Sequence, residues 1–262
     1  MEDKLIGREA LKQNFVAKEY LTTYVSVGCG GPPTCGTIYA PALEKLHKTF
    51  SRGDIRGDTL IDIGSGPTIY QHVSACEYFQ EIITSDFLEQ NQEEIKKWLK
   101  KDPEAYDWSL ILKYVCELEG NREKWMEKEE KLRRTIKRVL PCDATLPNPF
   151  DPVVLPPADC LLSTFALEVA CKDHSIYRSV VKNLGALVKP GGHLIFAATL
   201  GVSYWMVGPS KFDCMALTPE VVEGAVKDAG FEILSCESLG FTFPPGICDA
   251  YDALFLVARK PK

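Results

Sequence analysis

Short apolar runs alternate with amphipathic stretches along most of this chain, and that alternation predicts a regular order of strands and helices. We expect strands at residues 58–63, 81–86, 138–143, 159–165, 193–200, 231–240 and 253–259. The intervening pattern favours helices at about 68–78, 89–101, 174–187 and 218–229. Strands that alternate with helices indicate an α/β fold with a doubly wound, mostly parallel, seven-stranded sheet. The last two strands are joined by a loop rather than a helix, so we expect them to pair antiparallel at the sheet edge.

Three segments depart from this order. Residues 1–55 carry helical patterns, one of them at about 40–50, so we expect a helical lid in front of a sheet core at 56–262, all within the single domain 1–262. Residues 104–139 are charged and largely helical. Residues 203–214 form two short runs on either side of Gly208-Pro209. This pattern predicts a hairpin beyond the carboxyl edge of the sheet, where open α/β folds bind their ligands.

Composition narrows the choice of partners. The 262 residues carry a net charge of −6, so we expect neither a nucleic-acid surface nor one for anionic membranes. The ten cysteines are scattered without a C-x-x-C spacing, which favours free thiols over disulfides or a metal site. The amino terminus lacks the apolar segment of a signal peptide, and no run is long enough to span a membrane. We expect a cytoplasmic monomer that acts on a small molecule.

The strand-like run Leu60 to Ile63 leads directly into the turn Gly64-Ser65-Gly66, and Pro67 then fits the first turn of a helix. Glycines in such a turn can adopt positive φ and let a ligand approach the backbone. The dinucleotide motif G-x-G-x-x-G requires a third glycine where Ile69 stands, which disfavours a pyrophosphate. Asp86 ends the next strand, where such folds bind a ribose diol. This pattern indicates an adenosine-containing cofactor such as S-adenosylmethionine; the alternative is a turn that only joins strand to helix.

Further motifs extend over nearly the whole chain. They are the segment around Tyr20, the run at 57–71, Ser85-Asp86-Phe87 with Asn91, and the stretches 97–101, 106–108, 117–121, 142–143 and 189–194. With these motifs the sequence resembles the small-molecule N-methyltransferases that act on nicotinamide, indolethylamines and phenylethanolamine. The resemblance implies a class I, Rossmann-like methyltransferase fold that binds S-adenosyl-L-methionine.

The resemblance also implies roles for individual cofactor residues. Gly64, Ser65 and Gly66 would line the methionine part, with Tyr20, Thr68 and Tyr70 also at the cofactor. Asp86 would bind the ribose hydroxyls beside Asn91, Asp143 and Ala144 would address the adenine edge, and Thr164 would lie near the sulfonium. The sequence departs from the family at Val25, where a second cofactor tyrosine is expected, and we expect the neighbouring Tyr24 to replace it.

The same resemblance bears on the substrate. The nicotinamide enzymes place an aspartate where Ala198 stands, which disfavours nicotinamide. Glu168, in the segment that begins at Phe165, and Asp249 match positions where arylalkylamine enzymes keep carboxylates near the amine. An ammonium group needs such an anion, and a low-dielectric pocket strengthens the contact. The other expected substrate residues are Phe165 and Ala198 in predicted strands, Tyr20 in the lid, and Tyr204 and Asp213 in the hairpin, with Trp205 as an aromatic wall.

We therefore predict an S-adenosylmethionine-dependent enzyme that methylates the amine nitrogen of a small arylalkylamine, similar to an indolethylamine. Glu168 and Asp249 would orient the ammonium and accept its proton. Two alternatives within the same family are a nicotinamide or pyridine N-methyltransferase and a phenylethanolamine-type enzyme. A third alternative, from another class, is a non-catalytic module that only binds the cofactor.

Overall fold

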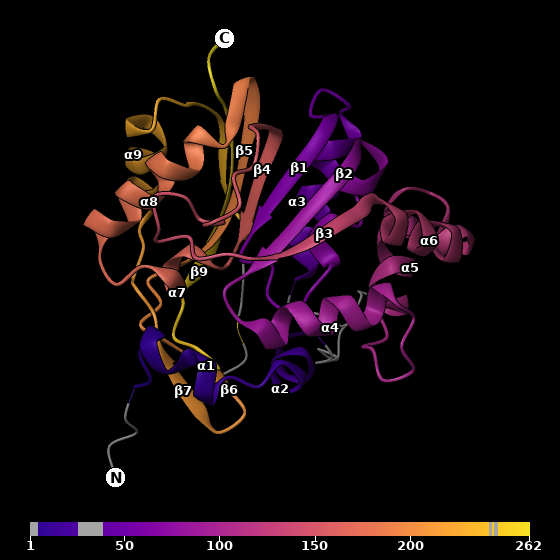
Figure 1. Cartoon of the computed structure of the whole chain (residues 1–262), viewed down its shortest axis with the longest axis horizontal. Coiled ribbons are helices and arrows are strands. Elements are labelled where there is room, and N and C mark those ends of the chain that lie inside the picture. Colours follow the sequence, from indigo (N-terminus) through magenta and orange to yellow (C-terminus); the bar gives the residue numbers. More distant parts are fainter. Residues whose placement is uncertain (1–4, 26–38, 241–242, 244–245) are drawn as a thin grey trace.

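A seven-stranded sheet forms the centre of the computed structural model, which describes residues 5–25, 39–240, 243 and 246–262 (Figure 1). The strand order is β3-β2-β1-β4-β5-β9-β8. The strands are β1 (Gly57–Ile63), β2 (Phe79–Asp86), β3 (Ile136–Pro141), β4 (Ala158–Thr164), β5 (Val188–Leu200), β8 (Glu232–Ser238) and β9 (Asp252–Arg259). β1 to β5 are parallel, whereas β9 is antiparallel to both β5 and β8. The doubly wound fold and the antiparallel final pair are confirmed.

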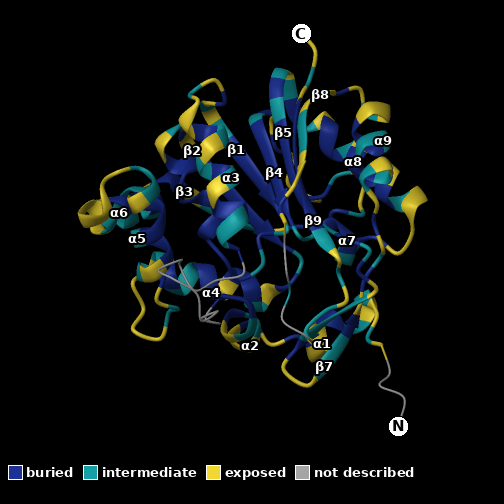
Figure 2. Cartoon of the chain, turned by 180° about the vertical axis from the view of Figure 1, so that it is seen from behind, coloured by how far each residue is buried: buried dark blue, intermediate teal, exposed yellow. Residues whose placement is uncertain are grey.

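Successive side chains of a strand point to opposite faces, and this alternation creates two cores. On β1, Leu60 packs into one core and Ile61 into the other. The first core is covered by α3 (Ala40–Ser51), α4 (Glu89–Leu99), α5 (Ser109–Leu118) and α6 (Trp125–Thr135). The second is covered by α7 (Leu167–Ala170), α8 (His174–Ala186) and α9 (Pro219–Asp228). Figure 2 shows the buried strands between helices whose outer turns are exposed.

The helix predicted at 68–78 is wrong. The segment instead forms two short 3₁₀ turns, Tyr70–His72 and Ala75–Glu77. Thr68 donates its hydroxyl to the Ser65 carbonyl at 2.7 Å, and the Gln71 amide donates to the Ser65 carbonyl at 3.2 Å. Such bonds between side chains and the backbone compete with a regular helix. Burial of this segment behind the glycine turn therefore overrides its helical pattern.

Two strands begin or end at other residues than predicted. β3 begins at Ile136 and ends at Pro141, so Asp143 follows the strand rather than ending it. The Lys189–Gly192 stretch, expected as a turn before a strand, lies inside β5. The partner of Ala158 is Val188 while that of Cys160 is His193, so β5 bulges between these two pairs. Gly191 has a φ of +79°, which accommodates the bulge.

The amino-terminal segment and the hairpin lie together at the carboxyl edge of the sheet (Figure 1). We call residues 5–25 the lid segment; they form a 3₁₀ turn at Arg8–Ala10, α1 (Leu11–Asn14), α2 (Ala17–Tyr20) and a π-helical turn at Leu21–Val25. The predicted hairpin is confirmed as β6 (Tyr204–Val207) and β7 (Ser210–Asp213). Ile6 extends it, because its N–H donates to the Lys211 carbonyl and its carbonyl accepts from Asp213.

The cysteines of the described residues form no disulfide. Eight cysteines lie within the described residues, and all eight are free thiols; Cys29 and Cys35 lie outside that part of the chain. Within the same residues, no three His, Cys, Asp or Glu side chains are grouped so that they could hold a metal ion. The described helices include none long and apolar enough to cross a membrane.

Candidate active site

A cavity opens at the carboxyl ends of β1, β2 and β4, under the lid segment. It spans about 830 Å³, including space open to solvent, and ligand pockets typically span about 300–1,000 Å³. We call it the first cavity. It brings together most of the residues predicted to bind the cofactor: Tyr20, Gly64, Ser65, Gly66, Thr68, Tyr70, Asp86, Asn91, Ala144 and Thr164. Arg8, Leu11 and Phe15 of the lid segment complete one wall.

The glycine turn gives this cavity a bare floor. Gly64 and Gly66 have φ of +73° and +61°, values that side chains rarely adopt. A Cβ on Gly64 would lie 2.4 Å from the Cβ of Ala166, so that glycine allows β1 and the segment after β4 to pack together. At Gly66 nothing lies within 4 Å of the equivalent position. A ligand can therefore contact the backbone of the turn at Gly66.

Asp86 connects the glycine turn to α4. Its Oδ2 accepts the Gly66 N–H at 2.8 Å, and its Oδ1 accepts from Leu88 N at 2.8 Å and from Asn91 Nδ2 at 2.9 Å. Burial raises the pKa of Asp86, although these hydrogen bonds oppose the rise. A carboxylate offers about four acceptor positions, so one position on Oδ2 remains. The Asn91 Oδ1 is buried and has no partner among the described residues. Both oxygens therefore have capacity for a further hydrogen bond.

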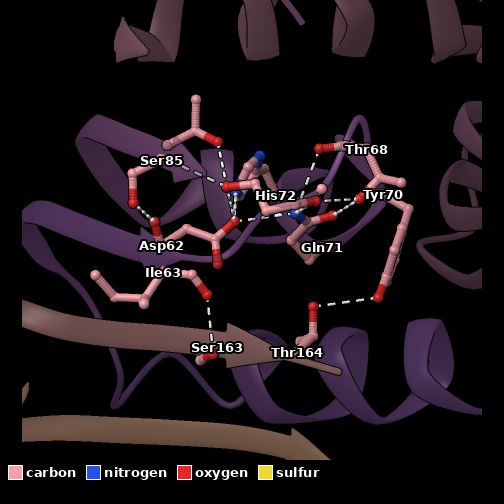
Figure 3. Close-up of polar contacts among 12 residues, drawn as sticks. Asp62, Ile63, Thr68, Tyr70, Gln71, His72, Ser85, Ser163 and Thr164 are labelled. Atoms are coloured by element: carbon pink, nitrogen blue, oxygen red, sulfur yellow. Dashed lines mark hydrogen bonds and ion pairs between the residues drawn. The ribbon is translucent and has the colours of Figure 1, made fainter. Parts of the chain in front are cut away.

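Behind the turn lies a buried network centred on Asp62 (Figure 3). Its Oδ2 accepts from Ser65 at 2.8 Å and Gln71 at 2.9 Å, and it lies 2.6 Å from His72 Nε2. The hydroxyls of Ser65 and Thr68 are thus bonded within the turn. These two residues shape the cavity, but their hydroxyls are not directed at a ligand. Tyr70 instead reaches across the sheet and donates to Thr164 at 3.2 Å.

A second cavity adjoins the first and shares Tyr20, Phe165, Val169 and Trp205 with it. It spans about 540 Å³ including space open to solvent. Most of its remaining lining is aromatic or apolar, and one acidic side chain is present. The other lining residues are Tyr24, Tyr39, Glu168, Thr199, Val202, Cys214, Phe243 and Cys248. The shared wall means that a ligand in one cavity lies next to a ligand in the other.

Glu168 is the acidic group in this lining, and its side chain is only 2% exposed. It lies on α7, three positions after Phe165, which has a φ of +55°. Its Oε1 accepts the Thr199 N–H and the Thr199 hydroxyl, both at 2.8 Å. Its Oε2 is buried without a partner among the described residues. Burial raises the pKa of Glu168 above its usual 4.5, although the bonds from Thr199 oppose the rise. A buried carboxylate with a free oxygen favours a cationic ligand.

Comparison with known proteins places the chain in a family. A model of the NNMT/PNMT/TEMT family matches residues 3–261. The chain belongs to this family. Indolethylamine N-methyltransferase of Oryctolagus cuniculus is 52% identical over an alignment of 266 positions, which covers 99% of this chain and 98% of that protein. Nicotinamide N-methyltransferase of Homo sapiens is 45% identical over 260 residues, with coverage of 99% and 98%.

Solved structures support the fold of this family member. Magnesium protoporphyrin IX methyltransferase of Synechocystis PCC 6803, solved with bound S-adenosylmethionine, has a TM-score of 0.59. The match covers 97% of this chain and 94% of that chain at 10% identity, so the likeness concerns the fold alone. The expected class I methyltransferase fold is confirmed. The resemblance of the motifs to the small-molecule N-methyltransferases is confirmed by the family match.

Several predicted contacts lie outside both cavities of this family member. Ser203 N donates to Asp249 Oδ1 at 2.7 Å, and the Ser203 hydroxyl donates to Oδ2. Asp249 is exposed and anchors the hairpin instead of lining the second cavity. Burial opposes its ionisation, but these hydrogen bonds outweigh burial and lower its pKa. Two other expected substrate residues, Tyr204 and Asp213, belong to the hairpin but not to the cavity lining.

Three further positions differ from expectation. Asp143 does not belong to the lining of the first cavity. Its carboxylate accepts hydrogen bonds from Arg8 at 2.5 Å and from Thr145. Tyr24 lines the second cavity, not the first, and donates its hydroxyl to the Met206 carbonyl at 2.8 Å. Ala198 is buried opposite Leu254 on β9 and lines neither cavity. Thr199 lines the second cavity because adjacent strand residues face opposite ways.

Asp249→Asn is therefore expected to change catalysis little. In this variant an amide replaces the carboxylate that accepts from Ser203. The weaker hydrogen bonds should lower the free energy of unfolding by about 1 kcal/mol. Methyl transfer to an arylalkylamine should keep its kcat/KM within about threefold of wild type, because a change that misses the transition state has little effect. Urea unfolding and steady-state kinetics measure both quantities. A loss of kcat/KM of about thirtyfold or more would return Asp249 to the substrate site.

Proposed function

We propose that the chain methylates the amine nitrogen of a small arylalkylamine. The first cavity would hold S-adenosylmethionine, and the second would hold the amine. The observation that carries this proposal is the free, buried Oε2 of Glu168 in an aromatic cavity that adjoins the first one. An ammonium group would neutralise that carboxylate, and the aromatic rings would stack against the flat part of the substrate.

Membership of the family makes the chain an S-adenosylmethionine-dependent N-methyltransferase. The residues of the first cavity fit this cofactor. The open backbone at Gly66 admits a close contact, while Asp86 Oδ2 and Asn91 Oδ1 provide acceptors for ribose hydroxyls. When bound, the cofactor supplies an activated methyl group and its own leaving group. The protein then has to position the acceptor nitrogen and exclude water.

Glu168 would serve the amine in two ways. Its carboxylate would orient the ammonium group toward the first cavity through charge and a hydrogen bond. A protonated amine has no lone pair to attack the methyl carbon, so the proton must leave first. Oε2 is the acceptor within the cavity, and a carboxyl pKa raised by burial makes it a better base near neutral pH. The shared wall of Tyr20, Phe165 and Trp205 would hold the two reactants in contact and keep water out.

A pyridine substrate such as nicotinamide is a weaker match to this cavity. Nicotinamide is neutral, so it would leave the Glu168 carboxylate buried without a counter-charge, at a cost of about 2–5 kcal/mol. The position where the resemblance expects a carboxamide-binding aspartate is Ala198, which lines neither cavity. A phenylethanolamine-type substrate carries the same ammonium group as an indolethylamine and remains within the proposed class.

Transfer of a labelled methyl group from S-adenosylmethionine tests the proposal with three acceptors: tryptamine, phenylethanolamine and nicotinamide. We expect kcat/KM for one of the two amines to exceed that for nicotinamide by about tenfold or more, the equivalent of about 1.4 kcal/mol. Preference for nicotinamide would contradict the amine assignment. Tight cofactor binding without turnover of any acceptor would instead favour a non-catalytic binding module.

A further inference from the structure

The first turn of α4 carries three consecutive side-chain amides, and each has a defined partner. Asn91 Nδ2 donates to Asp86 Oδ1 at 2.9 Å, and Gln92 Nε2 donates to the Asp86 carbonyl at 2.9 Å. Gln90 points the other way and binds the lid segment. One helical turn therefore contacts both the acid proposed to bind ribose and the segment that covers the first cavity.

Gln90 forms a double hydrogen bond with the lid backbone. Its Nε2 donates to the Phe15 carbonyl at 2.7 Å, and its Oε1 accepts the Ala17 N–H at 3.1 Å. Phe15 follows the last residue of α1 and Ala17 begins α2, with both Phe15 and Val16 in extended conformation. The two backbone groups are the type left without partners where helices end and begin. The half-buried Gln90 amide satisfies both.

The lid segment depends on such contacts for its position. α1 and α2 are four residues long each, and isolated helices of that length are not stable in water. At its two ends the segment is held by the backbone bonds of Ile6 to the hairpin and by the Tyr24 hydroxyl, which donates to the Met206 carbonyl. Nearer its middle, Phe15 packs on Trp205 with ring centroids 5.9 Å apart, and Arg8 forms a partly exposed ion pair with Asp143. A partly exposed ion pair contributes little and is screened by salt. Gln90 forms its bonds at the bend between the side chains of Phe15 and Tyr20, which both line the first cavity.

We propose that Gln90 is a positioning residue that holds the lid segment closed over the bound cofactor. The proposal rests on the proposed location of the cofactor in the first cavity. Gln90 would keep Phe15 and Tyr20 against the ligand, and its position next to Asn91 would connect lid closure to the ribose contacts of Asp86. Loss of these hydrogen bonds should weaken cofactor binding and speed its release. Because Tyr20 also lines the second cavity, KM for the amine should rise as well.

Gln90→Met tests the proposal, because methionine keeps the length of the side chain but forms neither hydrogen bond. With S-adenosylhomocysteine as the probe in calorimetry, we expect its Kd to rise about tenfold, as the loss of two modest hydrogen bonds predicts. Trypsin provides an independent readout, since Lys12 and Lys18 are exposed residues of the lid segment. Saturating S-adenosylhomocysteine should slow cleavage at these lysines in wild type and much less in Gln90→Met. Gln80→Met, at an exposed position on β2, is the matched control.

Gln90→Glu separates a hydrogen-bond role from a packing role. A glutamate accepts the Ala17 N–H but donates to the Phe15 carbonyl only when it is protonated. The difference in S-adenosylhomocysteine affinity between this variant and wild type should therefore narrow as the pH falls from about 8 to about 5, toward the usual glutamate pKa. An unchanged Kd and unchanged trypsin protection in Gln90→Met, or a Gln90→Glu difference independent of pH, would overturn the proposal. Wild-type protein that fails to bind S-adenosylhomocysteine would instead overturn the proposed function.

Discussion

Replacing Glu168 with glutamine is expected to lower kcat/KM for an arylalkylamine by about thirtyfold to several thousandfold. Removing one partner of a buried ion contact costs about 2–5 kcal/mol, and each 1.4 kcal/mol is a factor of ten. Glutamine has nearly the same shape and still accepts hydrogen bonds from Thr199, as Glu168 Oε1 does. The loss would therefore report the missing charge and proton acceptor. Activity with nicotinamide, which brings no ammonium group, should change far less.

The pH dependence of the same variant separates catalysis from stability. In wild type the Glu168 pKa is raised above 4.5 by burial, so kcat/KM should rise with pH as this carboxyl ionises. The variant should lack that rise. For stability the sign is opposite: the folded protein holds the proton more tightly than the unfolded chain, so ionisation lowers the free energy of unfolding as pH rises from about 4.5 through the folded pKa. Glu168→Gln should therefore be at least as stable as wild type at neutral pH.

Steady-state kinetics from pH 5 to 9, with urea unfolding at each pH, measure both effects. Glu220→Gln on the exposed surface of α9 is the matched control, and it should match wild type in kcat/KM and in its pH profile. Full arylalkylamine activity in Glu168→Gln would show that Oε2 does not contact the amine. The neutral pyridine substrate would then become the better explanation of the second cavity.

The order of elements could be predicted from the sequence because burial imposes a period on each element. β1 and β9 contribute side chains to both cores, so each is visible in the sequence as a short continuous apolar run. The segment after the glycine turn could not be predicted in this way. Its apolar spacing is helical, but Thr68 and Gln71 bind the backbone of the turn, and this depends on the position of Asp62 in three dimensions. Boundaries such as the start of β3 have little local signal.

The first cavity was more predictable than the second. Its residues could be located from the predicted strand ends, because the glycine turn follows β1 directly and Asp86 is the last residue of β2. The second cavity is formed by segments far apart in the chain, and Tyr39 gave no signal before folding placed it there. Thr199 could have been found from the alternation on β5, because its neighbour Ala198 faces the opposite core. Asp249 has the right charge for an amine, but its bonds to Ser203, which is 46 positions away in the sequence, hold it beside the hairpin.

The second large effect is expected at Asp86. Asp86→Ala removes a charged acceptor from a ribose hydroxyl, and hydrogen bonds of that kind contribute about 1.5–3 kcal/mol. It also leaves the N–H groups of Gly66 and Leu88 without their acceptor. The glycine turn would then lose one of its anchors to α4. We expect the Kd of S-adenosylmethionine to rise by about ten- to a hundredfold, from the lost ribose contact and a less ordered turn together.

Two comparisons separate these contributions. Asp86→Asn keeps a single oxygen, which can accept either from Gly66 or from Leu88 and Asn91, and its NH₂ group then faces the remaining donors. Its affinity should therefore lie between those of Asp86→Ala and wild type. Asp58→Ala, at the exposed amino end of β1, should bind the cofactor like wild type. Calorimetry with S-adenosylmethionine gives the affinity, and thermal unfolding without ligand reports the loss of the anchor alone. Unchanged affinity in Asp86→Ala would mean that the ribose lies elsewhere and that Asp86 serves only to join the turn to α4.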